Sequence, residues 1–201
     1  MEKTNFTIVK ESLKLHLNIP SNNYLDHIYF VIPDQDLDLD LNYDVFKDSK
    51  LNIKVIILGS NDLKINCFLN ANLKSHYNHI EFEILAYAND NANIKIISNV
   101  DVELKTIDNK SKQTLIGVLL SDQAKILGEP NLKINSLNVN AKHSLRIGTL
   151  DKDEIFYLLT KGLPLEQAKQ ILINAIVTKL ISNLSNEEQT WCFQKIKERI
   201  R

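Results

Sequence analysis

The chain has 201 residues, 44% of them apolar, and its 24 basic and 25 acidic side chains leave a formal net charge of −1. This length suits one domain with a sizeable core, and the apolar content argues against a disordered chain. The balanced charge provides no basic surface of the kind that binds nucleic acid or anionic lipid, so we expect neither as a partner.

The cysteines and the N-terminal segment bear on the compartment. Cys67 and Cys192 lie far apart and form no CxxC pattern, which argues against a disulfide framework and favours a reducing compartment. The N-terminal segment, MEKTNFTIVKESLKLHLN, contains no apolar core of a signal peptide. The longest apolar run that contains no tyrosine, VIIL at 55–58, is far shorter than the roughly 20 residues that span a bilayer. We therefore expect a cytoplasmic protein without a membrane partner.

Short strand-like segments follow one another from about residue 6 to residue 148. Apolar and polar residues alternate at 13–19 and 37–43, and further runs begin at residues 53, 63, 80, 94, 102, 114 and 132. Alternation with a period of two places one set of side chains on a buried face. The runs recur roughly every ten residues with Asn, Asp, Ser and Gly between them, a pattern typical of a sandwich, barrel or solenoid. Asn-Gly and Asp-Gly hairpin turns are absent, which favours Asn-rich solenoid corners.

The pattern changes to a helical one after Gly148. Asp151 is a predicted N-cap, Glu154 can complete a capping box, and Gly162 fits the position just after the helix. These signals predict a helix over residues 151–161.

Two further helices are expected. Pro164 fits the first position of the second helix, whose apolar residues at 165, 168, 171, 172, 175, 176 and 180 follow a helical period. Ser185 and Glu188 form a predicted capping box before a last helix. We therefore divide the chain into a strand-rich core at residues 1–148 and a C-terminal helical subdomain at residues 149–201.

Short motifs follow one another in a particular order between residues 119 and 168. Leu-Leu-Ser at 119–121 and Ala124 precede Pro-Asn-Leu-Lys-Ile at 130–134, and VNAKHSLRIG follows at 139–148. The series ends with Leu-Asp at 150–151, Phe-Tyr-Leu at 156–158, Gly162 and Ala168. In this order the segment resembles the C-terminal core of the SufB/SufD family, the scaffold proteins of iron–sulfur cluster assembly. Residues 26–41 and 53–65 resemble earlier strands of the family more weakly.

The resemblance implies a fold and a role. The fold is a right-handed parallel β-helix, or a flattened version of one, followed by C-terminal helices. The role is that of a non-enzymatic scaffold in the SUF system that pairs with itself or with a SufB-like scaffold. Pairing would use the exposed terminal strand between Val139 and Ile147, since an open strand edge is a template for another chain.

The resemblance also implies a second partner. A SufC-like ABC-type ATPase would bind the C-terminal helices, where Phe156, Tyr157 and Gly162 match the family series. The chain has no Walker motif, so the ATP chemistry would belong to that partner.

His143 is the first candidate site residue. It matches a family histidine that lies between two protomers, near where the nascent cluster forms, and a neutral imidazole is a competent iron ligand. We therefore expect His143 to bind iron or a transient iron–sulfur cluster, with no stably bound cofactor. The alternative is a hydrogen-bonded structural histidine.

The chain departs from the family pattern around this histidine. Ala141 stands where the family often has cysteine, Ser144 stands where it has glycine, and Leu145 and Arg146 replace a pair of small residues. Family members are also much longer. These departures support an alternative function, in which a reduced β-helix homodimer has a structural role and no cluster chemistry.

The other histidines carry weaker signals. His76 and His79 are three residues apart, a spacing that can share a metal on a helix, but the polar surroundings favour an exposed loop. His16 and His27 carry no pattern and are expected at the surface.

The cysteines and aspartates favour structural interpretations. Cys67 shares the parity of apolar neighbours and is expected in the core, as is Cys192 within the last helix. The aspartates at 34, 36, 38 and 40 are expected on the solvated face of one strand, with calcium binding as the alternative. A solenoid that acts on carbohydrate is disfavoured by the aromatic content of 7%.

Overall fold

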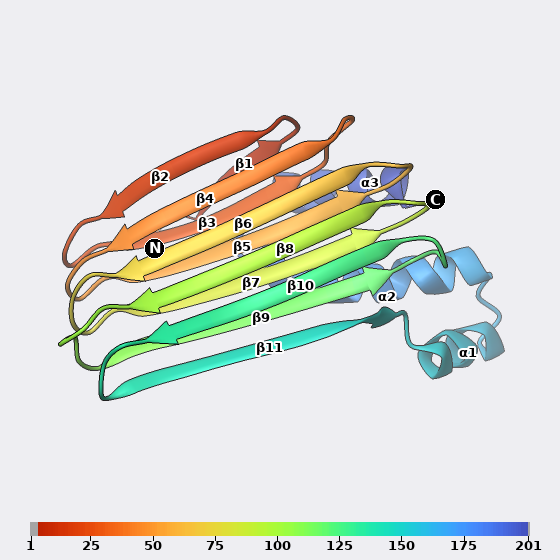
Figure 1. The fold of residues 1–201 in the computed structure, drawn as a ribbon. Helices are drawn as coiled ribbons and strands as arrows, with labels where there is room; N and C mark the ends of the chain where they lie inside the picture. Colours follow the sequence, from red (N-terminus) through yellow and green to blue (C-terminus); the bar gives the residue numbers. More distant parts are fainter. Residues whose placement is uncertain (1–3, 201) are drawn as a thin grey trace.

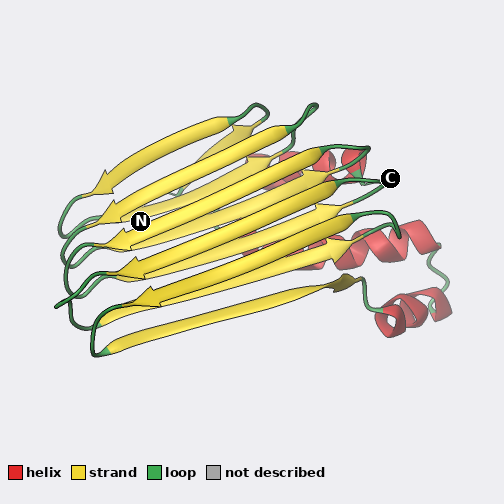
Figure 2. Cartoon of the chain, in the orientation of Figure 1, coloured by secondary structure: helices red, strands yellow, loops and turns green. Residues whose placement is uncertain are grey.

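Within residues 4–200, which the computed structural model describes, eleven strands are followed by three helices (Figures 1 and 2). The strands are β1 (Asn5–Val9), β2 (Leu13–Ile19), β3 (Tyr24–Val31), β4 (Leu37–Val45), β5 (Lys50–Gly59), β6 (Lys64–Leu73), β7 (His79–Ala88), β8 (Asn93–Val102), β9 (Asn109–Leu119), β10 (Lys125–Ile134) and β11 (Val139–Thr149). The helices are α1 (Lys152–Thr160), α2 (Leu165–Ile181) and α3 (Asn186–Arg199).

The strands form two parallel sheets that face each other. One has the order β1-β3-β5-β7-β9-β11, and the other has the order β10-β8-β6-β4-β2. Consecutive strands therefore alternate between the sheets, and each pair of strands makes one turn of a flattened β-solenoid (Figure 1). The predicted β-solenoid with a helical C-terminal part is confirmed.

Asparagine side chains join successive turns at one corner of the solenoid. The Asn78 Oδ1 atom accepts the Ser49 N–H at 3.1 Å, and the Asn109 Oδ1 atom accepts the Asn78 N–H at 2.9 Å. All three residues are buried, so these amides satisfy backbone donors that the strands cannot. Other corners contain Asn and Asp residues with positive φ, which these residue types tolerate. The Asn-rich corners of the sequence thus have the role that was predicted for them.

Two apolar clusters stabilise the molecule. The first fills the interior between the sheets with alternate side chains of each strand, such as Leu41, Ile53 and Phe82. The second lies between the outer face of the six-stranded sheet and helices α2 and α3, which cover it in Figure 1. The Tyr87 hydroxyl donates to the Ile173 carbonyl at 3.0 Å across this second cluster. The helices are therefore packed against the solenoid.

Two predicted strand segments differ from the structure. The run at 102–107 is a corner, because β8 ends at Val102 and β9 begins at Asn109, and Lys105 within it has positive φ. The run at 132–139 contains the end of β10, a corner and the start of β11. Apolar residues occur in both corners, so the hydrophobic pattern alone misplaced the strand boundaries.

The helix caps largely follow the prediction. The Asp151 carboxylate accepts the N–H groups of Asp153 and Glu154, Gly162 has a positive φ of 84° after α1, and Ser185 forms a capping box with Glu188. Pro164 is the N-cap of α2, one position earlier than predicted.

The buried face of α2 also differs from the prediction. Leu165 and Ile171 were expected on that face but are exposed, because the helix is apolar on most sides and the sheet selects only one stripe. The fully buried stripe is Ala168, Ile173, Val177, Leu180 and Ile181. None of the helices in the described part of the chain is long and apolar enough to cross a membrane.

Candidate functional site

The terminal strand β11 leaves one edge of the six-stranded sheet open. In the described structure it pairs with β9 alone, in parallel register from Val139 opposite Asn109 to Thr149 opposite Leu119. Lys110 of β9 and Leu120, which directly follows β9, donate their N–H groups to the preceding turn. Because donors alternate along a strand, the N–H groups of residues 141, 143, 145 and 147 of β11 point to the open edge. This edge can therefore pair with another strand.

His143 lies in the middle of this strand and is exposed. Its register partner on β9 is the buried Gln113. Paired residues of parallel strands point to the same face of the sheet. His143 therefore lies on the interior-facing side of β11, at the open end of the solenoid. Val139 and Ile147 have the same parity and are half-buried. The structure thus brings the predicted pairing residues and His143 onto one strand face.

Strand β10, the corresponding edge of the five-stranded sheet, is a poorer template for pairing. The Lys125 N–H donates to the Ala92 carbonyl just before β8, and the N–H of Asn135, just after β10, donates to the Val102 carbonyl of β8. The donors of the even-numbered residues of β10 therefore point to the free edge. One of these is Pro130, which has no N–H group, as expected for a proline in an edge strand. Of these two edges, β11 therefore has the uninterrupted row of N–H donors.

Polar side chains lie inside the solenoid in the turn that precedes His143. The Gln113 Oε1 atom accepts the Ser98 hydroxyl at 2.5 Å, and the Gln113 Nε2 atom donates to the Asn131 carbonyl at 3.0 Å. Ser111 pairs in register with Ala141, and its buried hydroxyl has no hydrogen-bond partner among the described residues. The sequence motifs did not point to these residues, although Ser and Gln at interior positions of a strand indicate a polar patch inside the solenoid.

Helix α1 begins directly after β11 and presents aromatic side chains to solvent. It has no buried residue, and the exposed fractions of Phe156 and Tyr157 are 67% and 60%. The Lys161 Nζ atom lies 5.1 Å from the centre of the Tyr157 ring. The positive φ of Gly162 turns the chain back toward α2. Exposed aromatic rings beside an open strand edge are suited to contact another protein.

A cleft of about 360 Å³ separates β11 from the helices. Its apolar wall includes Ile116, Leu172 and Ile176, and Arg146 and Glu154 also line it. A Cβ atom at Gly148 would meet nothing within 4 Å, so this glycine borders open space. The cleft therefore lies between strands β9 and β11 on one side and helices α1 and α2 on the other.

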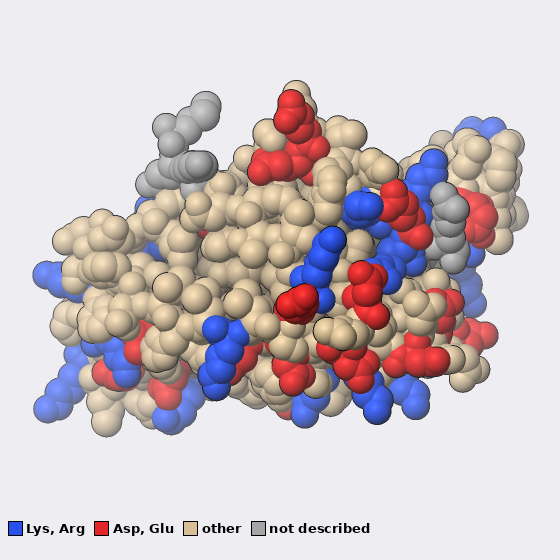
Figure 3. Space-filling model, turned by 90° about the horizontal axis from the view of Figure 1, so that it is seen from above, with Lys and Arg blue, Asp and Glu red and all other residues tan. Residues whose placement is uncertain are grey.

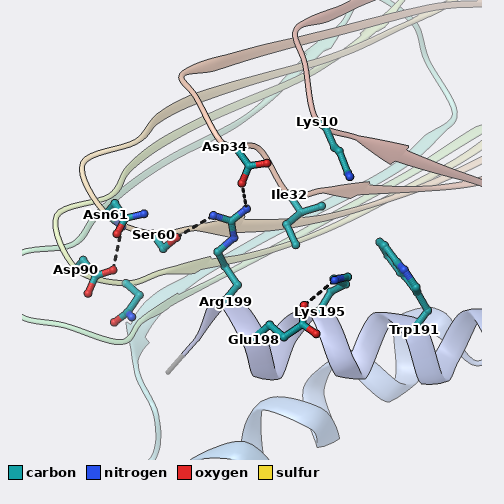
Figure 4. A pocket seen from close by; sticks show the side chains of 11 residues that line it. Lys10, Ile32, Asp34, Ser60, Asn61, Asp90, Trp191, Lys195, Glu198 and Arg199 are labelled. Carbon is teal, nitrogen blue, oxygen red and sulfur yellow. Dashed lines mark hydrogen bonds and ion pairs between the residues drawn. The ribbon is translucent and has the colours of Figure 1, made fainter.

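A second cleft, of about 430 Å³, lies between the solenoid corners and α3 (Figure 4). Arg199 joins the two parts, with 2.7 Å between its Nη2 atom and the Asp34 carboxylate. Lys195 pairs with Glu198 on the same wall, and Trp191 lies beside Lys195 (Figure 4). None of the predicted site residues lines this cleft.

The face formed by β1 and β2 shows no concentration of one charge. Figure 3 views the molecule from this side, with uncharged atoms across its middle and acidic and basic groups interspersed around them. A surface of this kind agrees with the balanced composition.

The remaining histidines lie apart from one another. His76 is in a corner rather than a helix, and its Nδ1 atom accepts the Ile107 N–H at 3.1 Å, while His79 is exposed at the start of β7. His16 is exposed and lies 3.0 Å from the Asp44 carboxylate. His27 was predicted at the surface but is half-buried on the interior parity of β3, 2.8 Å from the Thr7 hydroxyl, and burial lowers its pKa.

The cysteines are buried, as the sequence indicated. Burial raises the pKa of the Cys67 thiol to about 12, and burial together with the nearby Glu188 carboxylate raises that of Cys192 to about 12. Both side chains are therefore neutral thiols at physiological pH and poor metal ligands.

The predicted row of aspartates is only partly formed. Asp38 and Asp40 lie on β4, whereas Asp36 precedes it and accepts the Lys64 N–H, and Asp34 pairs with Arg199. Across residues 4–200, no group of three or more His, Cys, Asp and Glu side chains could hold a metal ion.

Comparison with known proteins identifies the family. Residues 35–176 match the family model described as "SUF system FeS cluster assembly, SufBD core domain". The chain is 30% identical over 90 residues to the chloroplastic protein ABCI7 of Arabidopsis thaliana. It is 27% identical over 88 residues to the iron–sulfur cluster assembly protein SufD of Escherichia coli.

The two alignments include 45% and 44% of this chain, but only 19% and 21% of the relatives. The chain thus matches about a fifth of the length of these curated relatives. The family model, in contrast, extends from β4 into α2 and includes the whole open edge with His143. The chain therefore belongs to the SufBD family of iron–sulfur cluster assembly proteins.

Proposed function

We propose that the chain is a non-enzymatic scaffold of SUF-type iron–sulfur cluster assembly. It pairs through the open edge of β11 and binds an ABC-type ATPase through its C-terminal helices. The observation that carries the proposal is the position of His143 on an unpaired, donor-bearing strand edge. The partner at the edge is a second copy of the chain or a SufB-like scaffold, and the protein acts in the cytoplasm.

His143 supplies one ligand to a transient cluster, which is cargo rather than a resident cofactor. Its imidazole is exposed on the strand that would face the partner, so both metal and partner can reach it. Cys67 and Cys192 are buried neutral thiols and do not contribute ligands. The remaining ligands would therefore come from the partner scaffold.

The ATPase binds the surface formed by Phe156, Tyr157 and the turn at Gly162. These aromatic side chains contribute little to the core, since α1 has no buried residue. The helix follows β11 after two residues, so ATPase binding and scaffold pairing take place on adjacent surfaces.

Anaerobic affinity purification of the tagged protein from its native cells tests the proposal. Co-purification of an ABC-type ATPase and of a second scaffold copy is the expected result. Recovery as an isolated homodimer that retains no iron, even after anaerobic reconstitution with its candidate partners, would favour the alternative. That alternative is a reduced β-helix homodimer with a structural role, which the alanine at position 141 supports.

A variant with two substitutions in α1 tests the ATPase-binding surface separately from scaffold pairing. Phe156→Ala with Tyr157→Ala should abolish ATPase co-purification and change the melting temperature little, because both rings are exposed. Ile171→Ala, an exposed apolar position on α2, is the matched control and should retain the ATPase. Equal ATPase recovery from all three proteins would exclude this surface.

A further inference from the structure

The interior of the solenoid changes from apolar to polar near its open end. In register along the six-stranded sheet, one interior column runs from His27 through Ile53, Phe82 and Gln113 to His143. Ile53 and Phe82 are fully buried apolar residues, and Gln113 is 1% exposed. A glutamine in this position loses its hydration, so its hydrogen bonds must compensate for that loss.

Both ends of the Gln113 amide cross the interior to the opposite sheet. Its Oε1 atom accepts the Ser98 hydroxyl of β8 at 2.5 Å, and its Nε2 atom donates to the Asn131 carbonyl of β10 at 3.0 Å. One side chain on β9 therefore joins two successive strands of the facing sheet. Hydrogen bonds are directional and short, so they set the separation of the sheets more narrowly than apolar contacts.

The last turn needs such a restraint because it is packed on one side only. Leu145 on β11 is 46% exposed, although its register partner Leu115 on β9 is buried. Leu145 fits against Gly128 of β10, where an added Cβ atom would lie 2.7 Å from its Cδ1 atom. Leu145 therefore contacts the facing sheet at Gly128, while much of its side chain stays open to solvent.

We propose that Gln113 is a positioning residue for the pairing edge. It fixes the distance between β9 and β10, and through the β9–β11 ladder it fixes the place of His143 relative to the facing sheet. The part concerned with pairing rests on the proposed function, whereas the part concerned with sheet separation does not. Pre-organisation of this kind lowers the entropy lost when a partner binds.

The other end of the solenoid provides a matched control. There the hydroxyls of Tyr29 on β3 and Tyr43 on β4 lie 3.1 Å apart, and this hydrogen bond also crosses the interior. In the six-stranded sheet β3 lies several strands away from β11, and in the five-stranded sheet β4 lies several strands away from β10. Removing this hydrogen bond should perturb the N-terminal turns and leave the open edge with His143 unchanged.

The experiment compares two double variants by pulsed electron paramagnetic resonance. Spin labels are placed at Glu129→Cys on β10 and Lys142→Cys on β11, while the native thiols are buried and stay unlabelled. Ser98→Ala with Gln113→Leu should broaden the distance distribution between the labels. Tyr29→Phe with Tyr43→Phe should leave that distribution as narrow as in the parent. An unchanged distribution in the Ser98 and Gln113 variant would overturn the inference.

Pairing is measured on the same unlabelled proteins by sedimentation equilibrium, alone and with the co-purified scaffold. Loss of the two cross-sheet hydrogen bonds should raise the dissociation constant about tenfold in the Ser98 and Gln113 variant, with no change in the tyrosine variant. Broadened distances with undiminished pairing would refute the link to pairing. If the parent itself pairs with nothing, the proposed function fails, while the distance measurement still decides the role of Gln113.

Discussion

The residues that could bind a metal differ in their accessibility, because the cysteines lie in the interior and His143 lies on the open edge. Cys67 and Cys192 are held as neutral thiols by burial, whereas His143 is exposed on a strand without a partner on one side. An exposed imidazole is free to bind a metal at neutral pH, and a buried thiol is not. At this scale, the proposed ligand role of His143 is supported by its accessibility together with its place on the open edge, which the exposed His16 and His79 do not share.

Replacing His143 should separate function from stability. We expect His143→Ala to impair cluster assembly with the partner scaffold, and to change the free energy of unfolding by less than about 0.5 kcal/mol because the side chain is exposed. Anaerobic reconstitution followed by absorption spectroscopy measures the first effect, and urea unfolding measures the second. His79→Ala, at another exposed strand position, is the control. Full assembly by His143→Ala would rule out a ligand role.

Cys67 should make stability depend on alkaline pH. Its pKa is raised from 9.0 to about 12 by burial, so the folded state keeps the proton in a range where the unfolded state releases it. The contribution of Cys67 is therefore complete below pH 9 and is lost as the pH rises toward 12, by at most about 1.4 kcal/mol per pH unit. Urea unfolding at pH 8 and pH 10 should show a larger loss for the parent than for Cys67→Ala. Parallel losses would contradict the assignment.

At the scale of elements, strand direction and donor alternation decide which edge is available. The N–H groups of odd-numbered residues of β11 face outward from the sheet edge, while Pro130 interrupts the equivalent row on β10. Helix α1 follows β11 immediately and adds exposed aromatic rings. The geometry of the last two strands and the first helix thus defines the surface proposed for both partners.

A proline substitution can test the edge without disrupting the sheet. Ala141→Pro removes an N–H group that points to the open edge, so it should prevent pairing while leaving the β9 ladder intact. Lys142→Pro instead removes a donor to β9 and should destabilise the fold by about 1–3 kcal/mol, because the carbonyl on β9 loses its partner. Thermal unfolding and sedimentation distinguish the two effects. Normal pairing by Ala141→Pro would show that another surface is used.

At the scale of the whole molecule, the helices complete the fold. Residues of β3, β5 and β7, such as Phe30, Leu58 and Tyr87, are fully buried beneath α2 and α3. Lys54, also buried, donates to the Leu180 carbonyl at the end of α2. The outer face of the six-stranded sheet is therefore apolar because the helices cover it.

Removal of the helices should expose this surface. A chain of residues 1–149 loses the cover of the second apolar cluster, so we expect it to aggregate and to bind hydrophobic dyes strongly. Size-exclusion chromatography and dye fluorescence provide the measurement. A monomeric, cooperatively folded truncated chain would contradict this expectation and would show that the residues before and after 148 fold independently.

The substitution Val177→Ala in the full chain is a milder test of the same cluster. It should lower the melting temperature, because it removes a fully buried apolar contact.

Local patterns predicted much of this architecture. Period-two alternation located most strands, Asn and Asp marked the corners, and cap residues such as Asp151 and Ser185 marked helix starts. These features are short-range, because they depend on backbone preferences and neighbouring side chains. The boundaries failed at 102–107 and 132–139, where apolar residues occur in corners that only the stacking of turns defines.

The sequence by itself determined the alternating strands, the helical tail and the family motifs around His143. The tertiary structure alone decided which N–H groups of β11 point to its free edge, that His27 lies on the interior-facing side of β3, and which stripe of α2 is buried. It also brought Gln113 together with Ser98 and Asn131 from the facing sheet. The physical reason is that strand order, burial and cross-sheet hydrogen bonds join residues distant in the chain, and local periodicity carries no information about such pairs.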